Sequence, residues 1–119
     1  DVERAMAAGT VDIVNVKIPK CGGIYRSQQI TQLCAQHGIP CFLGGCLETT
    51  PGTLAQAHFY TSTPNIISAA EMEGPSCYVD DIVSKAVTIE NGMITLQASP
   101  GFGTDISEEK MDQYRIDLS

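Results

Sequence analysis

The sequence has no tryptophan, and aromatic side chains make up only 6% of its 119 residues. A packed core is still expected, because hydrophobic residues reach 43% and no low-complexity stretch separates them. The wholly apolar runs span a few residues, far short of the roughly 20 that a membrane helix needs. No signal-peptide pattern is visible in these residues. We therefore expect a globular chain without a membrane partner, located in the cytoplasm.

Basic side chains are also scarce, since the sequence has seven Lys and Arg and 14 Asp and Glu, which gives a formal net charge of −7. The basic residues are scattered along the chain rather than clustered. Phosphate backbones and anionic membrane surfaces are bound through clusters of Lys and Arg. The charge pattern therefore excludes nucleic acid as an expected partner.

Disulfide and zinc-knuckle patterns are missing, because the cysteine count is odd and no pair has C-x-x-C spacing. Four of the five cysteines lie in apolar or Gly-rich surroundings. We expect them to be buried as small hydrophobic side chains in a reducing compartment. The five are Cys21, Cys34, Cys41, Cys46 and Cys77.

The order of the expected elements indicates the fold class. β-Branched residues mark the first strand, and helical spacing of apolar residues marks the helices. A helix over 2–8 is followed by a strand over 11–18, a helix over 25–37, a strand over 40–44, a helix over 51–60 and a strand over 66–71. Alternating strands and helices predict right-handed parallel α/β units.

The tail has a different pattern. Residues 86–97 alternate in polarity on both sides of Asn91-Gly92, which predicts a β-hairpin with a two-residue turn. A turn is expected at 100–103, and Asp105 or Ser107 can cap a helix around 108–114. We expect residues 1–83 to form the parallel units and residues 84–119 to form an accessory lobe.

Lys17 is the first candidate for chemistry. In the first strand Val14 and Val16 share one face, while Asn15 and Lys17 share the other. If the valines pack on helices, Lys17 points inward at the carboxyl end of the strand, where barrel enzymes place catalytic side chains. A partly desolvated lysine near a cation can take and return a proton. A solvated lysine that ends a strand is the alternative.

Further candidates lie in two other segments. Glu71 and Glu73 would point the same way from an extended chain, so they could bind a substrate ammonium or steer a proton. A solvated acidic loop is the alternative. Lys20 is a second cation for a substrate, unless it is an ordinary surface lysine. His37 and His58 fall on helices away from strand ends, so we do not expect them to be catalytic.

Four motifs in the same order resemble the muconate-lactonizing subgroup of the enolase superfamily, within the mandelate racemase/muconate lactonizing enzyme family. V-N-V-K-I-P-K-C-G-G-I (14–24) is similar to its sixth-strand segment. G-G-C-L-E-T (44–49) and G-T-L-A-Q-A-H (52–58) are similar to its seventh-strand turn and helix. E-M-E-G-P (71–75) resembles the eighth-strand end, and P-G-F-G (100–103) the return toward the capping lobe.

This resemblance implies the C-terminal part of a (β/α) TIM-type barrel, comprising its sixth to eighth strands, followed by a hairpin and helix that join the capping lobe. It implies a Mg²⁺ ion that stabilises an enediolate formed from a small carboxylate substrate. Lys17 matches the second catalytic lysine of the family, and Glu71 matches a glutamate near the substrate in cycloisomerases. Glu71 and Glu73 together resemble the D-x-D pair by which dipeptide epimerases bind an amino group, with longer side chains.

The chain departs from the family pattern in what it does not contain. The family's metal carboxylates and its other lysine lie on earlier strands, and a whole barrel takes about 250 residues. We therefore expect no metal ligand in this chain and no activity from it alone. The main prediction is a muconate cycloisomerase-like isomerase that assembles as a homo-oligomer. The alternatives are a dipeptide or amino-acid epimerase or racemase, and a non-catalytic α/β binding module.

Overall fold

The computed structural model describes residues 1–116, which form two compact units. The first unit contains residues 1–46 and 59–71, and the second contains residues 47–58 and 72–116. The predicted division between residues 83 and 84 stays a prediction. No helix in the described residues is both long and apolar enough to cross a bilayer.

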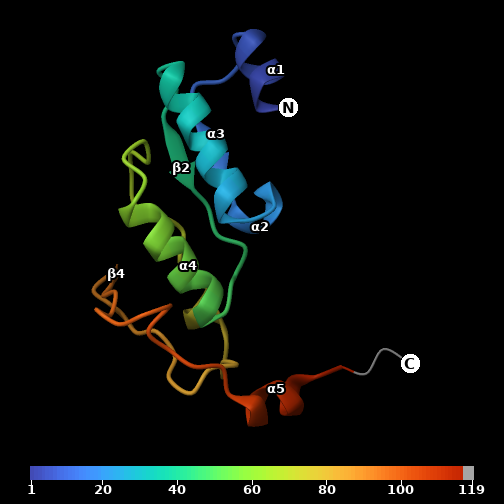
Figure 1. Ribbon diagram of the computed structural model, residues 1–119, viewed down its shortest axis with the longest axis vertical. Helices are drawn as coiled ribbons and strands as arrows, with labels where there is room; N and C mark the ends of the chain where they lie inside the picture. The colour runs from blue at the N-terminus through green and yellow to red at the C-terminus, as the bar shows by residue number, and fades with distance from the viewer. Residues whose placement is uncertain (117–119) are drawn as a thin grey trace. The chain divides into compact units, whose positions relative to one another are not determined.

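The first unit is built on a parallel strand pair. β1 (Val14–Val16) pairs with β2 (Cys41–Leu43) in a register that places Val16 opposite Leu43. The connection between them contains α3 (Ile24–Gln36), which lies beside β2 in Figure 1. The predicted parallel strand–helix–strand arrangement is confirmed.

Local signals explain where the helices of the first unit begin and end. α1 (Val2–Ala7) and α3 lie close to their predicted ranges. At the end of α3, Gly38 has φ +68°, and the Ile39 N–H donates to the Cys34 carbonyl at 2.9 Å. This is the Schellman arrangement, in which a glycine in the left-handed region lets the chain satisfy the last carbonyls of the helix.

Two predicted strands are shorter than expected. The first was predicted over 11–18, but Ile18 begins the short helix α2 (Ile18–Cys21), because Pro19 suits a first helical turn and has no N–H for a ladder. The prediction of a regular strand over 66–71 is wrong. Ile66 makes a single parallel bridge to Cys41, and residues 68–70 are Ser-Ala-Ala, which have little preference for strands.

The buried side of α3 is more polar than predicted. The helical spacing of apolar residues in the sequence predicts a buried face of Ile30, Leu33, Cys34 and His37. The residues that the structure buries are Ser27, Thr31 and Cys34. The two hydroxyls are buried without an unpaired donor, because each donates to a carbonyl of the same helix region. His37 is exposed, with Nδ1 2.9 Å from the Leu33 carbonyl oxygen.

The expectation that four cysteines are buried is also wrong. Cys34 and Cys41 have no exposed surface and lie in the core of the first unit. Cys21 is half-buried, and Cys46 and Cys77 are exposed. Apolar neighbours in the sequence therefore predicted burial only where the cysteine also lies on a packed helix or strand.

The second unit contains most of α4 (Thr50–Thr61), the 3₁₀ helix η1 (Gly74–Cys77), the hairpin strands β3 (Ile89–Glu90) and β4 (Met93–Ile94), and α5 (Glu108–Tyr114). The predicted hairpin is confirmed, since β3 and β4 pair antiparallel with Ile89 opposite Ile94. Asn91 and Gly92 have φ values of +52° and +74°, as a type I′ turn requires.

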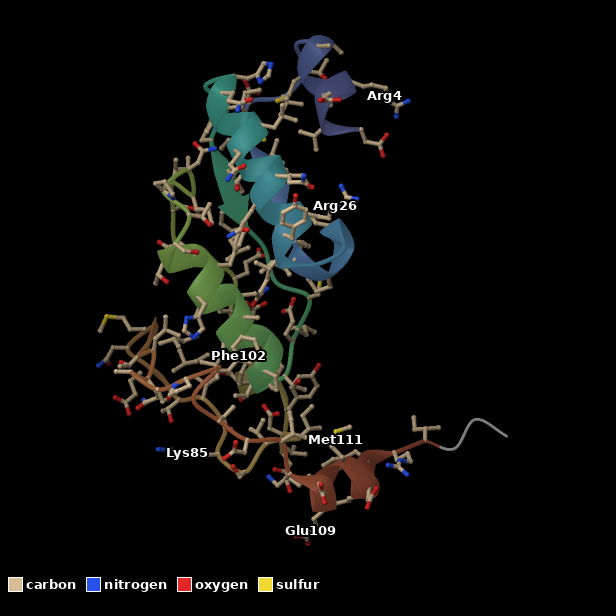
Figure 2. The ribbon with its side chains drawn as sticks, in the orientation of Figure 1. Arg4, Arg26, Lys85, Phe102, Glu109 and Met111 are labelled. Carbon is tan, nitrogen blue, oxygen red and sulfur yellow. The ribbon has the colours of Figure 1, made fainter. Side chains whose placement is uncertain are left out.

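The predicted helix cap at Ser107 and the predicted turn over 100–103 are also found in this unit. The Ser107 hydroxyl accepts a hydrogen bond from the Lys110 N–H at 3.3 Å, so it caps α5. Phe102, labelled in Figure 2 beside α4, places its ring centroid 6.1 Å from that of His58. The turn over 100–103 is thereby packed against the helix that precedes it in the chain.

Candidate functional site

Lys17 lies directly after the last residue of β1, at the N-cap of α2, with an extended backbone. The alternation along the strand places Val16 in the core with no exposed surface, while Asn15 is exposed. The Lys17 side chain is 26% exposed, so most of its surface is removed from solvent. The strand therefore presents a partly desolvated amine at its carboxyl end.

The amine of Lys17 contacts two acceptors from distant parts of the chain. Its Nζ donates to the carbonyl oxygen of Gly45. It also lies 3.4 Å from Oε2 of Glu71, whose side chain is 48% exposed. The N–H of Gly45 donates to the same Glu71 oxygen at 3.1 Å. Lys17, Gly45 and Glu71 thus form one connected polar cluster.

The parallel register of the first unit brings these segments together. Gly44 extends the pairing of β2 beyond its last residue, because its N–H donates to the Val16 carbonyl at 2.9 Å. The N–H of Glu71 donates to the Leu43 carbonyl at 3.0 Å. The cluster therefore lies where β1 and β2 end, at the carboxyl edge where α/β folds place ligands.

Of the other predicted site residues, Lys20 is exposed in α2 and has no hydrogen bond or ion pair from its side chain within residues 1–116. Glu73 belongs to the second unit, where it is exposed at the N-cap of η1. The structure thus joins Lys17 with Glu71 in one cluster. Lys20 takes no part in that cluster.

The sequence patterns did not identify Gly45 as a member of the cluster. Its contribution comes from its backbone carbonyl and N–H, which no side-chain motif reveals. The signal that could have found it is the Gly44-Gly45 doublet after β2, because paired glycines often mark a close approach of another segment.

Glu48 follows that doublet and has an anchoring role in the second unit. Its Oε1 accepts from Gln56 Nε2 at 3.0 Å, and its backbone carbonyl accepts from the Thr53 hydroxyl at 3.2 Å. Gln56 is only 1% exposed, so the contact is well shielded from solvent. These bonds tie the residues before α4 to the first turns of the helix.

The side chains of residues 1–116 do not form a magnesium site of their own. Within residues 1–116, no three His, Cys, Asp or Glu side chains come close enough together to hold an ion. Mg²⁺ prefers several oxygen ligands in an octahedral arrangement. Glu71 alone, already bonded to Lys17 and Gly45, does not meet that requirement.

A groove of about 400 Å³ lies elsewhere, in the second unit, and contains none of the predicted site residues. Its lining includes Leu54, Lys85, Met93 and Phe102. The chemistry-bearing side chains singled out from the sequence are therefore not those that line this groove.

Comparisons with known proteins agree with the four motifs. The family model described as enolase C-terminal domain-like matches residues 1–110. The chain is 32% identical over 117 residues to an o-succinylbenzoate synthase of Geobacillus kaustophilus, covering 96% of this chain and 30% of the relative. It is 42% identical over 71 residues to a hydrophobic dipeptide epimerase of Enterococcus faecalis, covering 58% of this chain and 20% of the relative.

Comparison with a solved structure points to the same superfamily. The muconate lactonizing enzyme from Pseudomonas putida has a TM-score of 0.86 and 28% sequence identity, over 95% of this chain and 32% of that chain. The parallel strand pair and this likeness define an α/β chain with the fold of the C-terminal part of an enolase-superfamily barrel. The chain belongs to the enolase C-terminal domain-like family, so the predicted family is confirmed. The match spans about a third of the length of the o-succinylbenzoate synthase and of the muconate lactonizing enzyme, and a fifth of the length of the dipeptide epimerase.

Proposed function

We propose that this chain is the C-terminal part of a muconate cycloisomerase-like isomerase that removes a proton from the carbon next to a substrate carboxylate. Lys17 is the acid/base residue, and Glu71 contributes to substrate handling. The observation that carries the proposal is the partly buried Lys17 amine at the carboxyl end of β1, held by Gly45 and Glu71. The likeness to muconate lactonizing enzyme supports the same reaction class.

The proposed step is a proton transfer between carbon and nitrogen. The neutral Lys17 amine takes the proton, the C–H bond breaks, and its electron pair moves into the adjacent carboxylate. The reverse transfer returns the proton from the ammonium to carbon. General acid–base catalysis of this kind contributes about 10²–10⁴-fold in rate. Partial burial favours the transfer, because water competes less for the amine.

In the proposal a magnesium ion supplies charge stabilisation to the substrate carboxylate, with ligands from outside residues 1–116. The expected substrate is a small carboxylate. The homo-oligomer and the cytoplasmic location also stay predictions.

The test replaces Lys17 by Met in the natural protein that carries this sequence. A panel of muconate lactonisation, o-succinylbenzoate formation and dipeptide epimerisation first identifies the reaction that the parent protein performs. Lys17→Met should lower kcat for that reaction by about 10²–10⁴-fold, because a thioether cannot transfer the proton. The matched control is Lys85→Met, which removes an exposed lysine of the second unit (Figure 2) and should leave kcat unchanged.

Unchanged kcat in Lys17→Met would overturn the acid/base role of Lys17. A parent protein that catalyses none of the three reactions would favour the non-catalytic α/β binding module. A circular dichroism spectrum and a melting temperature for each variant separate loss of chemistry from loss of fold.

A dipeptide epimerase of the same subgroup is the second candidate function. The 42% identity to a hydrophobic dipeptide epimerase favours it, and the aligned region covers 58% of this chain. In this proposal the acidic side chains of the E-M-E-G-P motif bind the substrate's ammonium group. Glu71→Gln and Glu73→Gln should then each raise KM for hydrophobic dipeptides and have less effect on kcat. Unchanged KM values in both variants would count against the epimerase.

A further inference from the structure

The Gly45 peptide contacts both side chains of the cluster. Its carbonyl oxygen accepts from Lys17 Nζ, and its N–H donates to Glu71 Oε2 at 3.1 Å. The 3.4 Å contact between Lys17 Nζ and the same Glu71 oxygen closes the ring. A single peptide group therefore sets the position of the amine relative to the carboxylate.

This arrangement limits the directions available to the amine. The nitrogen of lysine is tetrahedral, with one bond to Cε. Two of its N–H bonds point at the Gly45 carbonyl and the Glu71 carboxylate. One direction is left for the proton or the lone pair that would face a substrate. Reactions that depend on a fixed approach are sensitive to displacements of about 1 Å, which can cost about 10²-fold in rate.

Both glycines of the doublet are needed for space rather than for backbone conformation. A Cβ at position 45 would lie 2.6 Å from the backbone oxygen of Glu71. A Cβ at position 44 would lie 2.9 Å from Lys17 Cε and would also clash with Asn15 Oδ1. Neither glycine has φ in the left-handed region, so the requirement is steric.

We infer that Gly44 and Gly45 are positioning residues for Lys17: they let the Gly45 peptide approach the amine and Glu71 and so aim the proton-transferring direction of Lys17. This inference rests on the proposed function. It assigns the G-G doublet a role in catalysis that its place in a turn does not require. The side chain of Asn15, packed against Gly44, belongs to the same close contact.

The test is Gly45→Ala in the natural protein that carries this sequence. The added methyl group should displace Glu71 or the Gly45 peptide and misalign Lys17. The expected result is a fall in kcat of about 10²-fold with KM changed by less than about 3-fold. A second measurement is the incorporation of deuterium from D₂O into muconolactone or a hydrophobic dipeptide, followed by NMR. Incorporation at the substrate face to which Lys17 transfers the proton should decrease.

The matched control is Gly38→Ala. Gly38 has φ +68° with nothing within 4 Å of an added Cβ, so alanine there introduces backbone strain without touching Lys17. Gly38→Ala should lower the melting temperature and leave kcat and deuterium incorporation unchanged. A purely structural role for Gly45 predicts the same behaviour in Gly45→Ala, and that result would overturn the inference.

The outcomes also separate this inference from the proposed function. If Lys17→Met retains deuterium incorporation, the acid/base role itself fails. If Lys17→Met loses it and Gly45→Ala retains it, only the positioning role fails. A crystal structure of Gly45→Ala gives a test that needs no substrate. Lys17 Nζ should move more than about 1 Å from its place between Gly45 and Glu71, and an unmoved amine would overturn the inference.

Discussion

Asp81 places Oδ2 of its carboxylate 2.8 Å from the backbone nitrogen of Thr50, the first residue of α4. The other carboxylate oxygen accepts from the Ile82 N–H at 2.7 Å. Asp81 is 5% exposed, and it lies 31 residues after Thr50 in the sequence. It supplies a negative charge to the N-terminus of α4, where the helix dipole favours one.

Asp81→Ala should therefore destabilise the chain. The substitution leaves the buried Thr50 N–H and the part-buried Ile82 N–H without their acceptor. An unsatisfied buried group costs about 1–3 kcal/mol. Urea denaturation followed by circular dichroism measures the loss. Asp12→Ala, at an exposed aspartate, should change the free energy of unfolding by less than about 0.5 kcal/mol. Equal losses in the two variants would contradict the capping role.

Asp80 should make stability depend on pH at the acid end. A hydrogen bond from Lys110 Nζ at 2.6 Å, the Asp81 backbone N–H and the Tyr114 hydroxyl hold the pKa of Asp80 at about 2, below the ordinary 3.8. The unfolded chain therefore binds the proton more tightly than the folded chain does. The stabilising contribution is present above about pH 4 and is lost as the pH falls toward about 2.

The same contacts act in the opposite direction at high pH. The hydrogen bonds to Asp80 raise the pKa of Lys110 and the pKa of Tyr114, so their contribution is present below the ordinary values and is lost as the pH rises through the raised ones. Urea midpoints measured from pH 2 to pH 11 should show a shallower acid limb in Asp80→Asn. In a double-mutant cycle, adding Lys110→Met to Asp80→Asn should cost little more, and additive losses would contradict the contact.

The cysteines should differ sharply in reactivity. Burial, followed by the neighbouring Cys34, raises the pKa of the Cys41 thiol to about 12, so very little thiolate exists at pH 8. Iodoacetamide at pH 8 should label the exposed Cys46 and Cys77 and leave Cys34 and Cys41 unmodified. Tandem mass spectrometry of chymotryptic peptides reports each position, because trypsin would leave these four cysteines in a single peptide between Arg26 and Lys85. The same reaction in denaturant should label all of them. Early labelling of Cys41 in the folded chain would contradict its burial.

Local patterns predicted the elements whose determinants are close together in the sequence. The Asn91-Gly92 turn and the Ser107 cap each depend on a few neighbouring residues, and each is found where it was predicted. α3 ends at Gln36, close to the predicted end at residue 37. The prediction of a regular strand over 66–71 was wrong, because the apolar residues there made only a bridge at Ile66 rather than a ladder.

The position of Lys17 at the carboxyl end of β1 was readable from the alternation of Asn15 and Lys17 with the two valines. The hydrogen-bond acceptors of its amine could not be read from the sequence in this way. Gly45 and Glu71 lie 28 and 54 residues after Lys17, and a contact across that separation depends on how the strands pack. Glu71 was a candidate through its motif, whereas the backbone of Gly45 left no side-chain signal.

The sequence by itself determined the class of fold, the family and the strand end that carries the lysine, because periodicity and short motifs are local properties. Only the tertiary structure decided that the Gly45 peptide joins Lys17 to Glu71 and that Asp81 caps α4. The physical reason is that these hydrogen bonds form between segments brought together by burial of apolar residues such as Val16 and Leu43 in one unit and Leu54 and Val83 in the other.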